Sequence, residues 1–81
     1  MRPIKELDFE GGDCTIGVIP HSGQTVVYTL IDREEEGVEL HTCTLRWRGM
    51  SESRTLYADA ETAEQAAKDN FRRRQLMRVV A

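Results

Sequence analysis

Several features that mark common protein classes are missing from this sequence. No apolar run approaches the ~20 residues that a bilayer-spanning helix needs, and residues 1–13 lack the apolar core of a secretory signal. Cysteine is scarce, with two residues among 81. We therefore expect a cytoplasmic protein without a membrane segment, in which Cys14 and Cys43 remain reduced thiols.

The motifs of metal and catalytic sites are also missing. Structural zinc sites use closely paired ligands, whereas the two cysteines and two histidines here are scattered along the chain. No glycine-rich loop precedes a helix, because Gly11 and Gly12 come before a stretch with strand character. An activated nucleophile needs a base and an orienting group beside it, and a chain of this size has little room for a substrate pocket. We therefore expect no enzymatic activity, no metal and no cofactor.

Length and charge define what kind of domain is present. The 81 residues are expected to form a single domain, 1–81, that buries roughly 60–65% of its unfolded surface. The charge is unevenly placed. Residues 1–40 carry three basic and nine acidic side chains, a net −6, and residues 41–81 carry eight basic and five acidic, a net +3. This polarity favours charge-guided association with a partner.

Four segments have the β-branched content and alternation of strands. They are 14–20, 25–32, 38–48 and 54–58, separated by turn-rich segments at 21–24, 33–37 and 49–53. Segment 25–32 is apolar on both faces, as a central strand would be. The short connections predict antiparallel hairpins between consecutive strands.

Segment 38–48 contains the only tryptophan. Its alternation gives two faces, one with His41, Cys43, Leu45 and Trp47 and the other with Leu40, Thr42, Thr44, Arg46 and Arg48. We predict that the first face meets the core, because Leu45 and Trp47 carry large apolar area, whereas burying unpaired arginines costs several kcal/mol. Thr44, Arg46 and Arg48 then face water or a partner. An exposed Trp47 would instead reverse the two faces and make it a candidate interface anchor.

The hydrophobic period changes to that of a helix from Thr62 onward. The apolar stripe consists of Ala63, Ala66, Ala67, Phe71 and Met77. Thr62 and Gln65 form a capping-box pattern, and residues 76–80 are expected to leave the helix and add a short edge strand. The predicted fold is α+β, a small antiparallel sheet of three to four strands with one C-terminal helix packed on one face.

Charged groups are the candidate partner-binding residues. They are the acidic run Glu34, Glu35 and Glu36 on a hairpin connection, Arg46 and Arg48 on the long strand, and Arg72 and Arg73 near the end of the helix. Arginine outnumbers lysine nine to two, and its guanidinium suits bidentate contacts with carboxylate or phosphate.

These residues predict a small non-catalytic module that binds a protein partner as a regulator or inhibitor. The alternative is a nucleic-acid-binding protein that uses its arginine clusters, although the net charge of −3 differs from the usual basic footprint. Unpaired backbone groups at a sheet edge also allow a homodimer.

Two resemblances accompany this prediction. The acidic run, the small size and the architecture are similar in style to phage-encoded inhibitors such as anti-CRISPR proteins, which implies an inhibitor of a larger nucleic-acid-handling complex. The order of strands and helix is loosely similar to the second half of a double-stranded-RNA-binding domain. Segment 49–68, GMSESRTLYADAETAEQAAK, lacks the glycine and lysine signature of that family, so no residue role is carried over.

Overall fold

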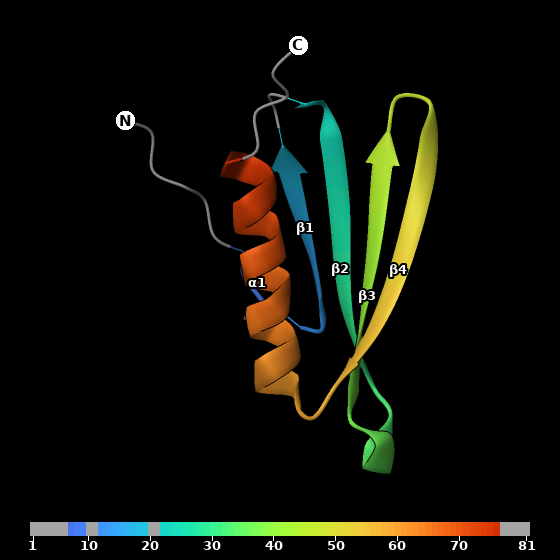
Figure 1. The fold of residues 1–81 in the computed structure, drawn as a ribbon, viewed down its shortest axis with the longest axis vertical. Coiled ribbons are helices and arrows are strands. Elements are labelled where there is room, and N and C mark those ends of the chain that lie inside the picture. Colours follow the sequence, from blue (N-terminus) through green and yellow to red (C-terminus); the bar gives the residue numbers. More distant parts are fainter. Residues whose placement is uncertain (1–6, 10–11, 20–21, 77–81) are drawn as a thin grey trace.

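The computed structural model describes residues 7–9, 12–19 and 22–76, which form a four-stranded antiparallel sheet with one helix across one face (Figure 1). Strands β1 (Cys14–Ile19), β2 (Gln24–Asp32), β3 (Val38–Arg46) and β4 (Gly49–Tyr57) lie side by side in chain order. A short 3-10 helix, η2 (Glu34–Glu36), connects β2 to β3, and helix α1 (Ala60–Leu76) follows β4. The predicted α+β fold is confirmed.

The β3–β4 hairpin is longer than the sequence indicated. Arg46 pairs with Gly49, so the connection is a two-residue turn made of Trp47 and Arg48. The turn predicted at 49–53 is therefore wrong, and these residues begin β4. Glycine and serine suggested a loop, but the ladder with β3 runs without a break from Gly49 to Tyr57, and a two-residue link is a common hairpin connection.

Helix α1 begins before the predicted position and is capped by a different residue. The carboxylate of Asp59 accepts a hydrogen bond from the backbone N–H of Thr62 over 2.8 Å, so Asp59, rather than Thr62, is the N-cap. The helix continues through Leu76, which corrects the predicted exit before that residue. Met77 and the edge strand predicted within residues 76–80 lie outside the described residues from 77 onward.

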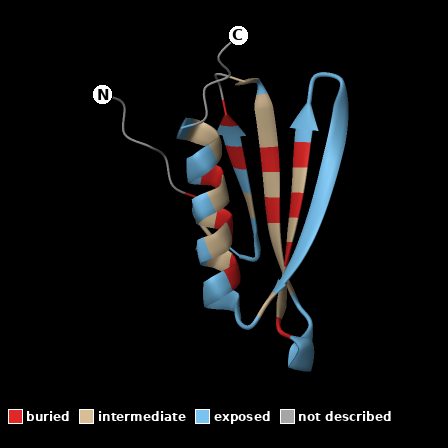
Figure 2. Ribbon diagram, viewed as in Figure 1, coloured by how far each residue is buried: buried red, intermediate tan, exposed pale blue. Residues whose placement is uncertain are grey.

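The core lies between α1 and the sheet (Figure 2). The rings of Tyr28 and Phe71 meet edge to face, with centroids 6.4 Å apart. Gly17 of β1 lets the Phe71 ring approach the sheet, because a Cβ there would lie 2.6 Å from Phe71 Cδ1. The helical stripe is confirmed over its described part, with Ala63, Ala67 and Phe71 buried. Among the described residues, the buried apolar ones are Leu7, Ile19, Val26, Tyr28, Leu40, Ala63, Ala67 and Phe71.

The predicted core face of β3 is wrong. Leu40, Thr42 and Thr44 are buried on the side of α1, and Trp47 is 94% exposed. The prediction treated Trp47 as part of the strand alternation, but β3 ends at Arg46 and Trp47 lies in the turn. Because side chains alternate with a period of two, this single misplacement reversed the whole strand. Thr44, predicted to face a partner, is 2% exposed.

Candidate functional site

The face of the sheet turned away from α1 carries large apolar side chains in contact with solvent. Among the described residues, the exposed ones on this face are Ile16, Val18, Leu45, Met50 and Leu56, with exposed fractions between 41 and 62%. The strand registers align Val18 with Thr25, Leu45 and Met50, one residue from each strand. Val18, Leu45 and Met50 form an apolar row across the sheet, interrupted by Thr25, at the end where the β3–β4 turn lies.

Trp47 lies in the turn that adjoins this row. Its side chain is almost fully exposed, and Arg46 and Arg48 on either side of it are exposed as well. Tryptophan and arginine are enriched among the residues that dominate binding energy in interfaces. We name Val18, Leu45, Met50, Trp47 and the two flanking arginines the hairpin-end patch; by the alternation of β3, Arg46 lies at its edge, on the side of the sheet that faces α1.

The acidic run lies at the opposite end of the sheet (Figure 1). Local hydrogen bonds fix its backbone: the Glu34 N–H donates to the Asp32 carboxylate over 2.8 Å, and the Arg33 N–H donates to the Gly37 carbonyl over 2.8 Å. The Arg33 guanidinium also contacts Glu39 at 2.7 Å and holds the pKa of that carboxyl below its usual value. The three glutamates of η2 are therefore exposed on an ordered loop.

Arg72 and Arg73 are exposed on the last turns of α1. That end of the helix and the β3–β4 turn lie at the same end of the molecule in Figure 1. The start of α1, with Asp59 and Glu61, lies at the end that carries η2. The charge polarity along the sequence thus becomes a polarity in space. The predicted partner-binding residues do not form one surface, but three: the acidic run, the turn arginines and the helix arginines.

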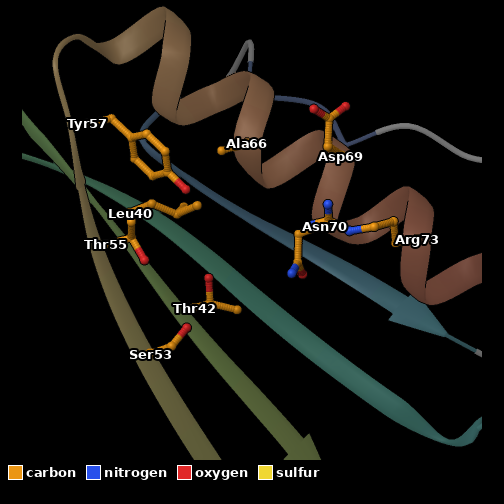
Figure 3. A pocket seen from close by; sticks show the side chains of 9 residues that line it. All are labelled: Leu40, Thr42, Ser53, Thr55, Tyr57, Ala66, Asp69, Asn70 and Arg73. Atoms are coloured by element: carbon orange, nitrogen blue, oxygen red, sulfur yellow. The ribbon is translucent and has the colours of Figure 1, made fainter.

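A polar groove of about 260 Å³ separates α1 from β3 and β4 (Figure 3). On the side of the sheet it is lined by the hydroxyls of Thr42, Ser53 and Thr55, with Leu40 and Tyr57 beside them. Two of its helix residues are already engaged, since Gln65 Nε2 donates to Asp69 Oδ1 over 3.0 Å and Tyr28 donates to Asn70 Oδ1 over 2.7 Å. The lining residues are Leu40, Thr42, Ser53, Thr55, Tyr57, Ala66, Asp69, Asn70 and Arg73.

The titratable groups of the open sheet face do not converge on a reactive centre. His41 Nε2 is buried and lies 3.7 Å from Glu52 Oε1, too far for a hydrogen bond. Within the described residues, no group of three or more His, Cys, Asp or Glu side chains is placed to hold a metal ion, and no helix is long and apolar enough to cross a membrane. Cys14 and Cys43 are free thiols on neighbouring parts of this face.

No protein-family model matches the chain, and no curated protein or solved structure is similar enough to count as a match. Sequence reasoning missed the apolar row, although its signal was present. The alternation of β1 places Ile16 and Val18 on one face, and the reversed β3 places Leu45 on the same side. Assigning Trp47 to the turn would have removed the main reason for placing that face in the core.

Proposed function

We propose that this protein is a non-catalytic module that binds a protein partner through the hairpin-end patch. The observation that carries the proposal is the 94% exposure of Trp47 beside the row formed by Val18, Leu45 and Met50. Exposed apolar side chains of this size, rimmed by charge, are typical of surfaces that become buried in a complex. The β3–β4 ladder ends directly at this turn, so Trp47 lies at the end of a regular hairpin.

The charges of the patch define the chemistry of its partner. Arg46 and Arg48 are exposed on both sides of Trp47, so the matching surface has an apolar pocket for the indole and acidic groups at its rim. The apolar contacts supply most of the affinity, since burial contributes roughly 25 cal/mol per Å². The arginines orient the complex and speed its formation, and their contribution falls as salt is added.

The regulatory role follows from the acidic run at the other end. Glu34, Glu35 and Glu36 present three carboxylates on an ordered loop, which suits a basic surface such as one that binds nucleic acid. One end of such a protein fits an apolar pocket with an acidic rim, and the other end fits a basic surface. The protein can therefore contact two sites of a larger nucleic-acid-handling complex. Inhibition by occupying the basic site is the activity that we propose.

The test is capture of a partner from a cell lysate by tagged protein, with nuclease treatment in every sample. We expect a stoichiometric protein that survives nuclease and is lost with Trp47→Ala and with the double variant Arg46→Glu/Arg48→Glu. Leu76→Ala removes another exposed apolar side chain, which belongs to α1 and not to the patch, and serves as the control. Equal capture by the patch variants and the wild type would overturn the proposal, provided that all variants unfold at the same temperature.

The competing function is nucleic-acid binding through the arginines. It is favoured by the position of Arg46 and Arg48 at the same end of the molecule as Arg72 and Arg73. Arginines that neutralise phosphates release counterions from the nucleic acid, so this function predicts an association constant that falls steeply with salt concentration. An affinity for oligonucleotides that does not change with salt, or no affinity at all, would exclude it.

A further inference from the structure

Strand β4 is a long edge strand, and no other described segment pairs with its free edge. It has nine residues and pairs with β3 along one edge. Every residue from Gly49 to Leu56 is exposed. Its sequence, GMSESRTLY, contains no proline, and the strand has no bulge in its ladder with β3. Natural proteins usually shorten, kink or cover such an edge, because its unpaired N–H and C=O groups can add a further strand.

In β4, residues at equal distances before and after Ser53 have complementary side chains. A two-fold axis through the Ser53 position would pair the strand with an antiparallel copy, so that residues equidistant from Ser53 face each other. The resulting cross-strand pairs are Glu52 with Arg54, Ser51 with Thr55, Met50 with Leu56 and Gly49 with Tyr57. In these pairs a glutamate faces an arginine, a serine faces a threonine, and a methionine faces a leucine.

We propose that two copies of this chain associate through β4 in this register, joining their two sheets into one. The association is isologous, so each pair occurs twice, and both Glu52–Arg54 pairs lie on the open face with Met50 and Leu56 beside them. The full length of β4 takes part.

Shifting the register by one step in either direction removes this complementarity. Side chains that are directly opposite in an antiparallel pair must share a face, so the axis must pass through a residue position. An axis at Glu52 places two glutamates opposite each other, and an axis at Arg54 places two arginines there. Like charges directly opposite are destabilising. The Ser53 register is therefore the one that the charges select.

The polarity of the molecule supports the same arrangement. An antiparallel two-fold places the hairpin end of one copy beside the acidic end of the other. Continuing the register past Gly49 brings Trp47 and Arg48 next to residues 58 and 59 of the second copy, where α1 begins with Asp59 and Glu61. The basic turn of each copy thus lies toward the acidic helix start of the other, a charge match that agrees with the Ser53 register.

The pairing would also change the polar groove. A two-fold axis perpendicular to the sheet keeps both helices on the same side of it. Ser53, which lines the groove in each copy, would lie at the axis. The two grooves then become one trough between two helices, with a continuous floor of serine and threonine hydroxyls. Because edge pairing buries little side-chain area, we expect a weak dimer with a dissociation constant in the micromolar range or above.

Charge exchange tests the register. Glu52→Arg and Arg54→Glu each place like charges in both pairs, so each variant should raise the dimer dissociation constant by about tenfold or more in sedimentation equilibrium. An equimolar mixture of the two variants restores opposite charges in every pair and should form a heterodimer. The double variant Glu52→Arg/Arg54→Glu should dimerise like the wild type. Asp13→Arg, an equal change of charge next to β1 at the other edge of the sheet, is the control.

Restored dimerisation in the mixture and in the double variant distinguishes loss of the interface from damage to the monomer. The distinction is needed because Glu52 also lies near His41. A wild-type chain that stays monomeric up to nearly millimolar concentration would overturn the proposal. Single variants that dimerise as the wild type does, or a mixture that stays monomeric, would also overturn it. These results do not test partner binding through Trp47, which the capture experiment measures.

A cross-link locates the axis. In a Cys14→Ser/Cys43→Ser background, Ser53→Cys should form an intermolecular disulfide on mild oxidation, because the two Cα atoms of a directly opposed pair lie about 4.5–5.5 Å apart. Ser51→Cys is the matched control on the same face. In the proposed register its two copies are four residues out of step, or about 14 Å, and should not cross-link. Equal rates at the two positions would overturn the register.

Discussion

The hydroxyl of Tyr28 donates a hydrogen bond to Oδ1 of Asn70 over 2.7 Å, joining the centre of the sheet to α1. Arg74 Nε donates to the same oxygen over 2.7 Å, and Arg74 also reaches Gln24 Oε1 at 3.2 Å. We expect Tyr28→Phe to lower the free energy of unfolding by about 1 kcal/mol, because Arg74 continues to satisfy Asn70. Urea unfolding at neutral pH measures this. A loss several times larger would mean that the bond organises the whole helix.

Alkaline pH should reveal the contribution of the Tyr28 hydroxyl to stability. Burial raises the pKa of Tyr28 to about 12, against the opposing effect of Arg74, while the unfolded chain titrates near 10. The folded state therefore holds this proton more tightly, and the stability it provides is complete below pH ~10 and is lost between pH ~10 and ~12. Tyr28→Phe lacks this loss. We expect the stability difference between wild type and variant to shrink as pH rises through that range, whereas a constant difference would contradict the raised pKa.

The contact between Gly17 and Phe71 predicts a destabilising substitution. A Cβ at position 17 would lie 2.6 Å from Phe71 Cδ1 and 3.1 Å from Leu7 Cδ2, and Phe71 is 3% exposed and cannot move aside freely. Gly17→Ala should lower the free energy of unfolding by about 1–3 kcal/mol, the usual range for overpacking. Gly49→Ala is the matched control, since no atom lies within 4 Å of its added Cβ. Equal stability of the two variants would place the Phe71 ring elsewhere.

Trp47→Ala should leave the free energy of unfolding within about 0.5 kcal/mol of the wild type, as for most surface substitutions. A tryptophan in the core would cost about 3–5 kcal/mol on the same change. The emission maximum of the single tryptophan gives a second readout, and we expect it at the wavelength of a solvated indole. A blue-shifted maximum together with a large loss of stability would restore the face assignment that the sequence favoured.

Capping of α1 predicts a pH-dependent effect at Asp59. The backbone N–H of Thr62 donates to its carboxylate and lowers its pKa. Because the folded-state pKa is depressed, the ionised carboxylate stabilises the fold above the unfolded value near 4 and this contribution is lost as the pH falls through the folded pKa. Asp59→Ala should lower the thermal midpoint by a few degrees at neutral pH. Asp59→Asn keeps the cap and should lose the acid dependence, which thermal scans at several pH values would show.

The parts of the fold that the sequence predicted are those set by local pattern. The two-sided apolar run of β2 identified the central strand, and the period of Ala63, Ala67 and Phe71 identified the packing face of α1. Short connections were sufficient to give an antiparallel sheet. Each of these features depends on a few neighbouring residues.

The parts that failed depend on where the helix lies. Alternation shows that Leu40, Thr42 and Thr44 share a face, but not that α1 covers it. That choice follows from the position of Phe71 over Gly17 and Tyr28, which is a property of the assembled core. The candidate site could not be predicted in full for the same reason. Arg46 and Arg48 were identified as exposed, whereas the apolar row beside them became visible only when the covered face was known.

The exposure of β4 has an evolutionary consequence. Eight successive residues of this strand are exposed, and substitutions at exposed positions usually change stability little, so mutations there would accumulate almost neutrally in a chain that acts alone. In a chain that pairs with itself, selection would act on the relation between two positions and not on either one. Among descendants of this sequence, an exchange of charge at Glu52 would then persist only where Arg54 has changed sign as well.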